Sequence, residues 1–147
     1  IAINSYVNIL NSTFNQCCSE EGYGTIYVIF RDRDQTKSFI SHCQFKNDNN
    51  ADQWESFNKK EIAISFSSGY GWFSSSHDRD ITILENCQFT NVKVDLSHFK
   101  QNRDRYKTTL KNCQFKNAPI IAHKDTYLRT DNCQFDNAGK ENIITIE

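Results

Sequence analysis

The chain is poor in the residues that usually make turns, with only 5 Gly and 1 Pro in 147 residues, whereas Asn occurs 16 times. It also lacks a charge excess, because 17 Lys and Arg residues stand against 18 Asp and Glu residues. A balanced charge disfavours non-specific binding to nucleic acid or to an anionic membrane surface. No apolar run approaches the ~18 residues that a membrane span needs. We therefore expect no nucleic-acid partner and no membrane span.

Apolar residues are also scarce, at 37% of the chain and a mean hydropathy of −0.68. Aromatic residues nevertheless make up 13% of the chain, including 11 Phe, which is too many for a disordered polypeptide. A length of 147 residues is typical of a single domain. We expect one folded domain, 1–147, around a thin core. Because the first residue is Ile and no leader follows it, we expect this domain to be an excerpt of a longer chain.

A short phrase recurs along the chain, and its consensus is Asn-Cys-Gln-Phe-x-Asn with an apolar residue three positions before the Cys. Four copies are centred on Cys43, Cys87, Cys113 and Cys133, and a fifth, degenerate copy reads Asn11-Ser12-Thr13-Phe14. The copies follow one another at unequal intervals. Unequal intervals predict a short fixed structural unit that is joined by loops of variable length.

Each unit predicts short strands on both sides of a corner. In Cys-Gln-Phe the apolar and polar residues alternate, as in a strand whose first and third side chains point inward. The residue before the Cys is Asn, or His in one copy, and Asn tolerates left-handed backbone, which suits a corner. A further apolar strand is expected once per unit, at Thr25–Phe30, Ile62–Phe66, Val92–Leu96, Ile120–Ala122 and Ile143–Ile146.

Together these elements predict an all-β fold in which three parallel sheets are wound as a coil, a solenoid of about five rungs. In such a coil each rung pairs with equivalent positions above and below it. The segments that do not fit the unit are expected to be loop insertions, at about 15–24, 47–60, 67–80 and 97–106.

The repeated unit resembles the right-handed parallel β-helix of pectin-lyase-like proteins, in which stacked Asn side chains fill the tight corner between the second and third sheets. The resemblance implies such an asparagine ladder here, made by Asn11, Asn86, Asn112 and Asn132, with His42 at the equivalent position of one unit. It covers nearly the whole chain and is specific for fold more than for activity. The Cys-Gln-Phe-x-Asn wording is also similar to β-helix repeats of eukaryotic microbial surface proteins.

The thiols of Cys43, Cys87, Cys113 and Cys133 are expected to form an inward ladder beside the Phe residues. Of three uses, the sequence favours core packing, because free Cys behaves as a small buried hydrophobe. Equivalent positions on neighbouring strands are ~4.8 Å apart, whereas a relaxed disulfide needs a Cβ separation of ~3.8 Å. No C-x-x-C pair or paired His supports a metal site. For Cys17-Cys18, in a predicted loop, a disulfide and free thiols both remain open.

The polar residues of the repeated phrase favour structural roles over functional ones. Stacked Gln44, Gln88, Gln114 and Gln134 are expected to point outward and to reinforce the coil through amide hydrogen bonds, rather than to form a binding face. Asn11-Ser12-Thr13 matches the N-glycosylation pattern, which is a weak pointer to secretion.

An enzymatic function finds little support. Enzymes of the resembled family carry their chemistry on outward positions of the first sheet, and glycoside hydrolysis requires paired carboxyl groups. The expected outward row contains a single carboxylate, Asp95, beside Tyr27, Ser65, Ile121 and Thr145. No nucleophile at a catalytic spacing and no phosphate-binding loop are present. The sequence therefore leans against an enzyme, and we expect no catalytic residue, no cofactor and no metal ion.

The best candidate for recognition is the segment 67–77, in which Tyr70, Trp72 and Phe73 offer apolar faces to a sugar ring or to a partner protein. Arg79, Arg103 and Arg105 are expected nearby. An alternative use of these aromatic side chains, as a lid folded onto the coil, remains open.

The resulting hypothesis is a non-catalytic structural or interaction module, a β-helical rod of a larger surface or filament protein that presents loops to glycans or proteins. Its open ends are expected to contact the rest of a longer chain or stacked subunits, because an uncapped sheet edge favours pairing. We expect an extracellular or cell-surface location. The alternative hypothesis is a polysaccharide lyase or glycoside hydrolase of the pectin-lyase-like fold.

Overall fold

The computed structural model describes residues 2–3, 7–16, 26–30, 38–47, 62–68, 79–98, 106–122, 126–136 and 144–146. Within these ranges every regular element is a β-strand. For the described part of the chain, the prediction of β-structure with parallel sheets is therefore confirmed. The expected loop residues Cys17, Cys18, Tyr70, Trp72, Phe73, Arg103 and Arg105 lie outside the described ranges.

The strands form three sheets. The first sheet contains β1 (Ala2–Ile3), β4 (Ile26–Phe30), β7 (Ile62–Ser68), β10 (Lys93–His98), β13 (Ile120–Ala122) and β16 (Ile144–Ile146). The second contains β2 (Asn8–Leu10), β5 (Ser38–Ser41), β8 (Arg79–Glu85), β11 (Tyr106–Lys111) and β14 (Thr126–Asp131). The third contains β3 (Thr13–Asn15), β6 (Gln44–Lys46), β9 (Gln88–Thr90), β12 (Gln114–Lys116) and β15 (Gln134–Asp136).

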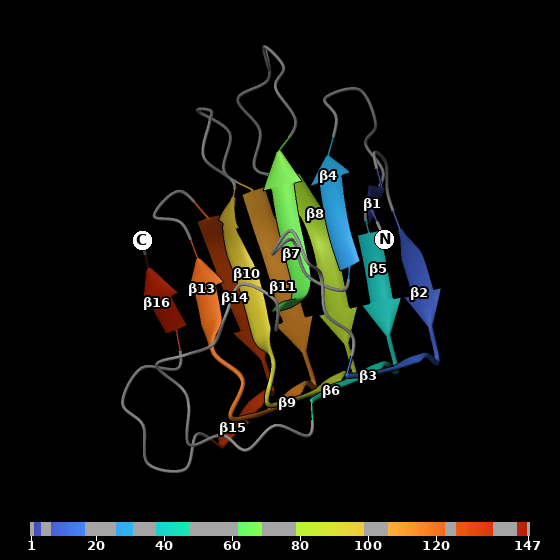
Figure 1. Cartoon of the computed structure of the whole chain (residues 1–147). Helices are drawn as coiled ribbons and strands as arrows, with labels where there is room; N and C mark the ends of the chain where they lie inside the picture. Colours follow the sequence, from blue (N-terminus) through green and yellow to red (C-terminus); the bar gives the residue numbers. More distant parts are fainter. Residues whose placement is uncertain are drawn as a thin grey trace.

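Neighbouring strands in every sheet are three apart in chain order, as in β3-β6-β9, and all of them pair in parallel. The chain therefore passes through the three sheets in turn and advances by one strand in each sheet on every pass. Figure 1 shows this advance from β1 to β16, with the two chain ends at opposite ends of the stack. Such a topology is compatible with a β-helical solenoid.

The strands extend further than the apolar pattern predicts. Strands take up both ends of the loops expected at about 67–80 and 97–106. The strand β7 continues to Ser68 and β8 begins at Arg79, while β10 ends at His98 and β11 begins at Tyr106. The reason is pairing between strands. Ser68 is in register with Phe30, and Tyr106 with Arg79, so polar strand ends are held extended by their neighbours.

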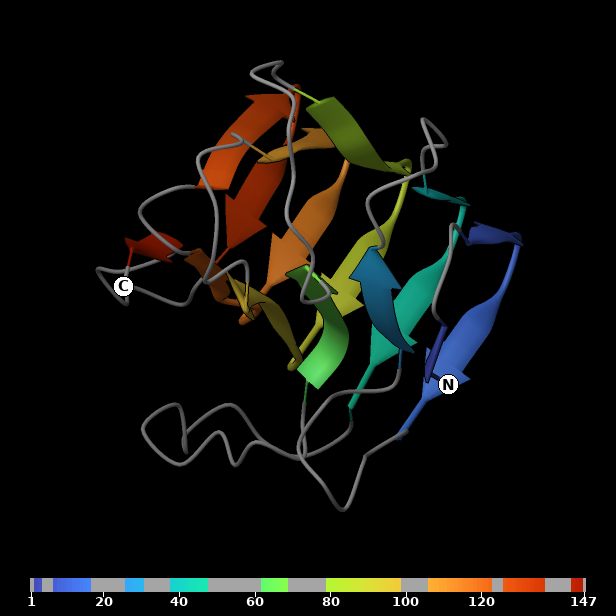
Figure 2. The ribbon, with the colours of Figure 1, turned by 90° about the horizontal axis from the view of Figure 1, so that it is seen from above.

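Figure 2 shows the three sheets from above. The core consists of side chains from all three sheets, and these side chains repeat from strand to strand. The third sheet contributes Phe45, Phe89 and Phe115, the second Ile40, Leu84 and Leu110, and the first Ile26, Ile64, Val94 and Ile120, all buried. The Phe rings stack nearly parallel, with neighbouring centroids 4.8–5.1 Å apart from Phe14 to Phe135. Each additional strand thus buries one more copy of the same apolar set.

Candidate functional site

The corner between the second and third sheets is made by residues with left-handed backbone. The φ angles of Asn11, His42, Asn86, Asn112 and Asn132 all lie between 51° and 54°. Asn adopts this region more readily than most other residues because its short amide can bond nearby backbone groups. The first four of these corners are also tied to the next strand along the stack, as where the backbone N–H of Asn86 donates to the carbonyl of Lys111 at 2.9 Å.

The side chains of this corner, which we call the asparagine row, contact one another along the stack. Nδ2 of Asn132 donates to Oδ1 of Asn112 at 2.9 Å, and Nδ2 of Asn86 lies 3.4 Å from Nε2 of His42. The His42 ring is also 2.7 Å from the hydroxyl of Ser41 through Nδ1. The row is a solvent-facing edge, since Asn11, His42, Asn112 and Asn132 are exposed.

A second left-handed corner follows the third sheet, at Gln16, Asn91 and Asn117. Here Nδ2 of Asn91 donates to the backbone oxygen of Asn47 at 2.9 Å, and Nδ2 of Asn117 donates to Oδ1 of Asn91 at 3.3 Å. The sequence signal for this corner is the second Asn of the repeated phrase, two residues after the Phe. An Asn at this position predicts the start of the next turn and a structural role.

The four repeated cysteines are free thiols, and Cys43, Cys87 and Cys113 are fully buried. Each sulfur lies within hydrogen-bond reach of the carbonyl two residues earlier, at 3.3–3.6 Å, and of a carbonyl on the preceding strand of the second sheet. Ser12, at the equivalent position of the degenerate copy, donates to the Leu10 carbonyl in the same way at 2.9 Å. The position thus accommodates a small donor.

Ionisation of the Cys113 and Cys133 thiols is disfavoured, whereas a hydrogen bond with Cys113 lowers the pKa of the Cys87 thiol. Contact with the sulfur of Cys87, together with burial, raises the pKa of the Cys113 thiol far above its ordinary value. Burial also raises the pKa of Cys133, which is only partly covered at the end of the stack. Because the thiolate is the nucleophile and the metal ligand, Cys113 and Cys133 are poorly suited to either chemistry.

The outer face of the third sheet is a regular polar surface. Gln44, Gln88, Gln114 and Gln134 are in register on neighbouring strands and are all exposed. Two residues further along each strand, Lys46, Lys116 and Asp136 are also exposed. This face offers amide donors and acceptors at a spacing of ~4.8 Å.

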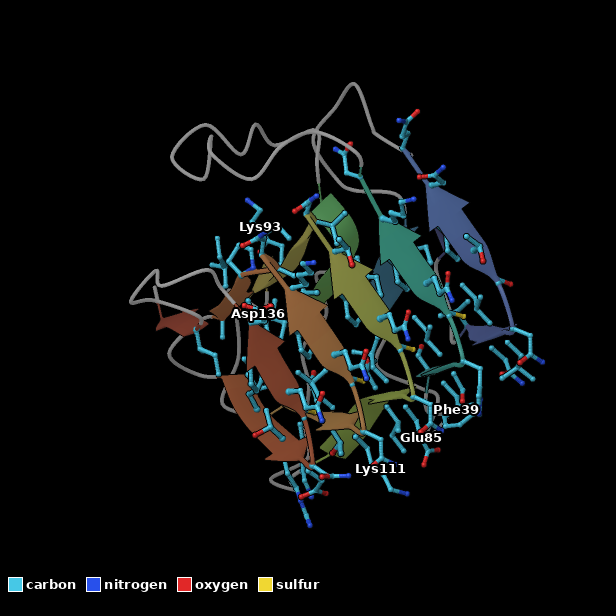
Figure 3. The ribbon with its side chains drawn as sticks, turned by 90° about the horizontal axis from the view of Figure 1, so that it is seen from below. Phe39, Glu85, Lys93, Lys111 and Asp136 are labelled. Atoms are coloured by element: carbon cyan, nitrogen blue, oxygen red, sulfur yellow. The ribbon has the colours of Figure 1, made fainter. Side chains whose placement is uncertain are left out.

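Charges of alternating sign line the end of the second sheet. Glu85, Lys111 and Asp131 are in register on β8, β11 and β14, and Nζ of Lys111 lies 2.7 Å from Oε1 of Glu85 (Figure 3). The contact with Glu85 raises the pKa of Lys111. Arg129 adds a second ion pair, with Nε 3.0 Å from Oδ2 of Asp131.

The candidate catalytic row of the alternative hypothesis is also in register, because Tyr27 pairs with Ser65, Ser65 with Asp95, Asp95 with Ile121, and Ile121 with Thr145. Asp95 is only 6% exposed, and its carboxylate lies 3.9 Å from Nζ of Lys93. Its register neighbours, Ser65 and Ile121, carry no carboxylate. This row offers one covered carboxylate beside a cation, not the pair that glycoside hydrolysis requires.

The predicted recognition segment is framed by described strands. It leaves the first sheet after Ser68 of β7 and enters the second sheet at Arg79 of β8. Ser68 is in register with Phe30, after which the segment 31–37 begins, and Arg79 is in register with Tyr106, before which the segment 99–105 ends. Thus the strand ends next to these three segments adjoin one another.

The described ranges contain neither a group of metal-ligating side chains nor a helix that could span a membrane. No three His, Cys, Asp or Glu side chains of these ranges are grouped as a metal ion would require. Within the same ranges no helix has the length and apolar content to cross a membrane.

Comparisons with known proteins return no match to a protein-family model, to a curated protein or to a solved structure. A functional assignment for this chain therefore depends on its own geometry.

Proposed function

We propose that the chain is a non-catalytic interaction module built as a right-handed parallel β-helix of about five rungs, of the kind found in pectin-lyase-like proteins. The observation that carries the proposal is the strand order, in which each sheet adds one strand per pass of the chain and equivalent side chains follow in register. The asparagine, Cys and Phe residues then act as structural ladders. In this reading the module is a rod whose length scales with the number of repeats.

Such a rod serves to hold loops in fixed positions. The strands that flank the segments 31–37, 69–78 and 99–105 end beside one another, so the three segments leave from one edge of the rod. Tyr70, Trp72 and Phe73, with Arg79, Arg103 and Arg105, supply the aromatic faces and the positive charge of the proposed recognition surface. A glycan or a protein of a cell surface is the partner class that these side chains suit, which favours an extracellular location.

A glycan panel tests this surface. The variant Trp72→Ala combined with Tyr70→Ala should lose binding at least tenfold while its circular dichroism spectrum stays that of the wild type. Trp54→Ala is the matched control, because Trp54 is the other tryptophan of the chain and belongs to a different segment. Equal binding by both variants contradicts the assignment of the recognition surface.

The lyase or hydrolase alternative would need more than Asp95, which is covered and lies beside Lys93. Incubation with acidic polysaccharides and added Ca²⁺ distinguishes the two functions. Depolymerisation that is abolished in Asp95→Asn would favour the enzyme.

A further inference from the structure

The two ends of the stack expose core side chains that are covered everywhere else. Phe45, Phe89 and Phe115 are at most 1% exposed, whereas the terminal members of the same ring stack, Phe14 and Phe135, are partly exposed. In the first sheet, Ile120 is fully buried and its register neighbour Ile144 is 41% exposed. Each end therefore presents a cross-section of the core.

The backbone groups at the two ends are complementary. Along the third sheet, the backbone N–H of each repeated Gln donates to a backbone carbonyl of the preceding unit, that of the repeated Cys or of its equivalent Ser12. Gln44 donates in this way to Ser12 and Gln134 to Cys113, both at 2.9 Å. Continued by one step, the pattern directs the N–H of Thr13 out of one end and the carbonyl of Cys133 out of the other. In the described part of the sheet, β3 and β15 are the two edge strands.

At the corner between the second and third sheets the hydrogen bonds run in the opposite direction, because each backbone N–H donates to the following unit of the stack. The N–H of Asn11 donates to the carbonyl of Ser41 at 3.1 Å, and the N–H of Asn112 donates to the carbonyl of Asp131 at 2.9 Å. If a further unit continued this pattern, the N–H of Asn132 would donate to the carbonyl that precedes the next corner, which is the position that Leu10 occupies before Asn11. Both ends thus carry one half of the same hydrogen-bond ladder.

Side chains at the two ends also match. If residues 129–136 of one copy lie next to residues 8–15 of a second copy, in the register that relates neighbouring units, equivalent side chains meet. Asn132 then precedes Asn11, and Phe135 precedes Phe14, so both stacks continue. The charged residues Arg129, Asp131 and Asp136 face the uncharged residues Asn8, Leu10 and Asn15, as the registers of β14 to β2 and β15 to β3 require. At these register positions of the second and third sheets, no two like charges meet.

The first sheet has one strand more than the other two, so β1 and β16 compete for a single place in a continuous stack. The two strands have the same register. Ala2 of β1 pairs with Tyr27 and Thr145 of β16 pairs with Ile121, and Tyr27 and Ile121 belong to the row that contains Asp95. Their sequences are alike as well, Ile1-Ala2-Ile3 and Ile144-Thr145-Ile146. Either strand can therefore occupy the place beside β4.

We infer that this chain assembles head to tail with further copies of itself. β14 and β15 of one copy pair with β2 and β3 of the next, and β16 takes the place of β1 beside β4 of that next copy. Because the contact joins two different surfaces and continues the stack along its own axis, it does not close into a ring and generates a filament. The inference rests on the proposed β-helix and makes no use of the recognition surface.

A charge introduced in place of Leu10 provides the sharpest test, since Leu10 is 48% exposed and would face Asp131 of the neighbouring copy. Leu10→Lys extends the alternation of Glu85, Lys111 and Asp131, and Leu10→Asp places two carboxylates opposite each other. In sedimentation velocity over a concentration series, the first variant should assemble about two- to fivefold more tightly and the second more weakly by a similar factor, with a smaller difference at high salt.

Removal of an edge donor is an independent test. Thr13→Pro deletes an N–H that points out of the stack, and Pro is tolerated at such an edge, so the variant should fold and remain monomeric. Thr13→Ala keeps the N–H and should assemble like the wild type. Deletion of residues 1–3 removes the competitor of β16 and should promote assembly.

The inference is overturned by a wild-type chain that stays monomeric at every concentration, or by Leu10→Lys and Leu10→Asp variants that assemble equally. Should Thr13→Pro lose its circular dichroism spectrum, the two Leu10 variants decide the question. Glycan binding by the monomeric variants reads out the recognition surface separately, so failure of either proposal leaves the other measurable.

Discussion

Asn132 donates a hydrogen bond from its side-chain Nδ2 to Oδ1 of Asn112 at 2.9 Å, across 20 positions of sequence. Both residues have left-handed backbone, with φ of 51° and 52°. One residue type thus meets two demands, an unusual backbone conformation and a hydrogen bond to its equivalent on the next strand. Four predictions follow from this and related contacts.

Replacement of Asn112 should separate the two demands. Asn112→Ala places a Cβ in left-handed backbone, which costs about 1–2 kcal/mol, and it also loses the amide contact. Asn112→Gly restores the backbone conformation and loses only the amide contact. We expect the Ala variant to be the less stable of the two by about 1 kcal/mol in urea unfolding. Equal stability would show that the backbone conformation has no energetic weight.

Native thiols should be nearly inert. Cys43, Cys87 and Cys113 are fully buried, so iodoacetamide should modify them only after unfolding. Cys133 should react slowly, because burial raises its pKa above the ordinary value of 9.0 and less thiolate is present at any given pH below it. Its alkylation rate, followed by mass spectrometry, should still be rising above pH 9.0. A plateau below that pH contradicts the raised pKa.

The ion pair of Lys111 and Glu85 should give a pH-dependent stability. The pKa of Lys111 is raised in the folded chain, so the contribution is fully present below the ordinary pKa of 10.5 and is lost as pH rises through the higher folded value. The stability difference between the wild type and Lys111→Gln should therefore be constant at neutral pH and should vanish in strong alkali. Because both side chains reach solvent, salt should also reduce it. If the stability difference persists in alkali and at high salt, it arises from packing of the Lys111 side chain and not from the ion pair.

Buried hydroxyls of the second sheet should have opposite effects when removed. The Oγ1 atoms of Thr82 and Thr108 are buried and lack a hydrogen-bond partner, whereas Oγ of Ser38 accepts from the N–H of Val7 at 3.1 Å. Thr108→Val should raise the free energy of unfolding by about 1 kcal/mol, because an unpaired buried hydroxyl is replaced by a methyl group.

Ser38→Ala is the matched variant and should lower the free energy of unfolding by about 1–2 kcal/mol, since it leaves the Val7 N–H unpaired. Thermal or urea unfolding measures both changes. A destabilised Thr108→Val variant would indicate that Thr108 has a partner, such as a buried water molecule.

The positions of most strands follow from local patterns in the sequence. The alternation in Cys-Gln-Phe predicts β6, β9, β12 and β15, and apolar runs such as Ile62–Phe66 predict strands of the first sheet. Strand ends were less predictable. Ser67, Ser68 and His98 belong to strands because neighbouring strands pair with them, which no local pattern reveals. The recognition residues Tyr70, Trp72, Phe73, Arg103 and Arg105 remain predictions.

Burial was the least predictable property of the candidate site. The sequence places Asp95 on the outer side of its strand between Val94 and Leu96, yet the carboxylate is almost fully covered and lies near Lys93. Whether an outward side chain meets solvent depends on what other parts of the chain lie over it. A turn at Asn91 and Asn117 is expected from the sequence, but its left-handed backbone is not, because Asn two residues after a Phe is equally compatible with an ordinary turn.

The sequence by itself determined the all-β character of the chain, the alternation of inward and outward residues, and the repetition of Asn, Cys and Phe. These are local properties, set by side-chain type and by the period of a strand. Only the tertiary structure decided which units pair, in what register, and which side chains form the ends. Loops of unequal length separate the units, so the pairing is selected by packing Phe on Phe and Asn on Asn, contacts that exist only once distant segments lie side by side.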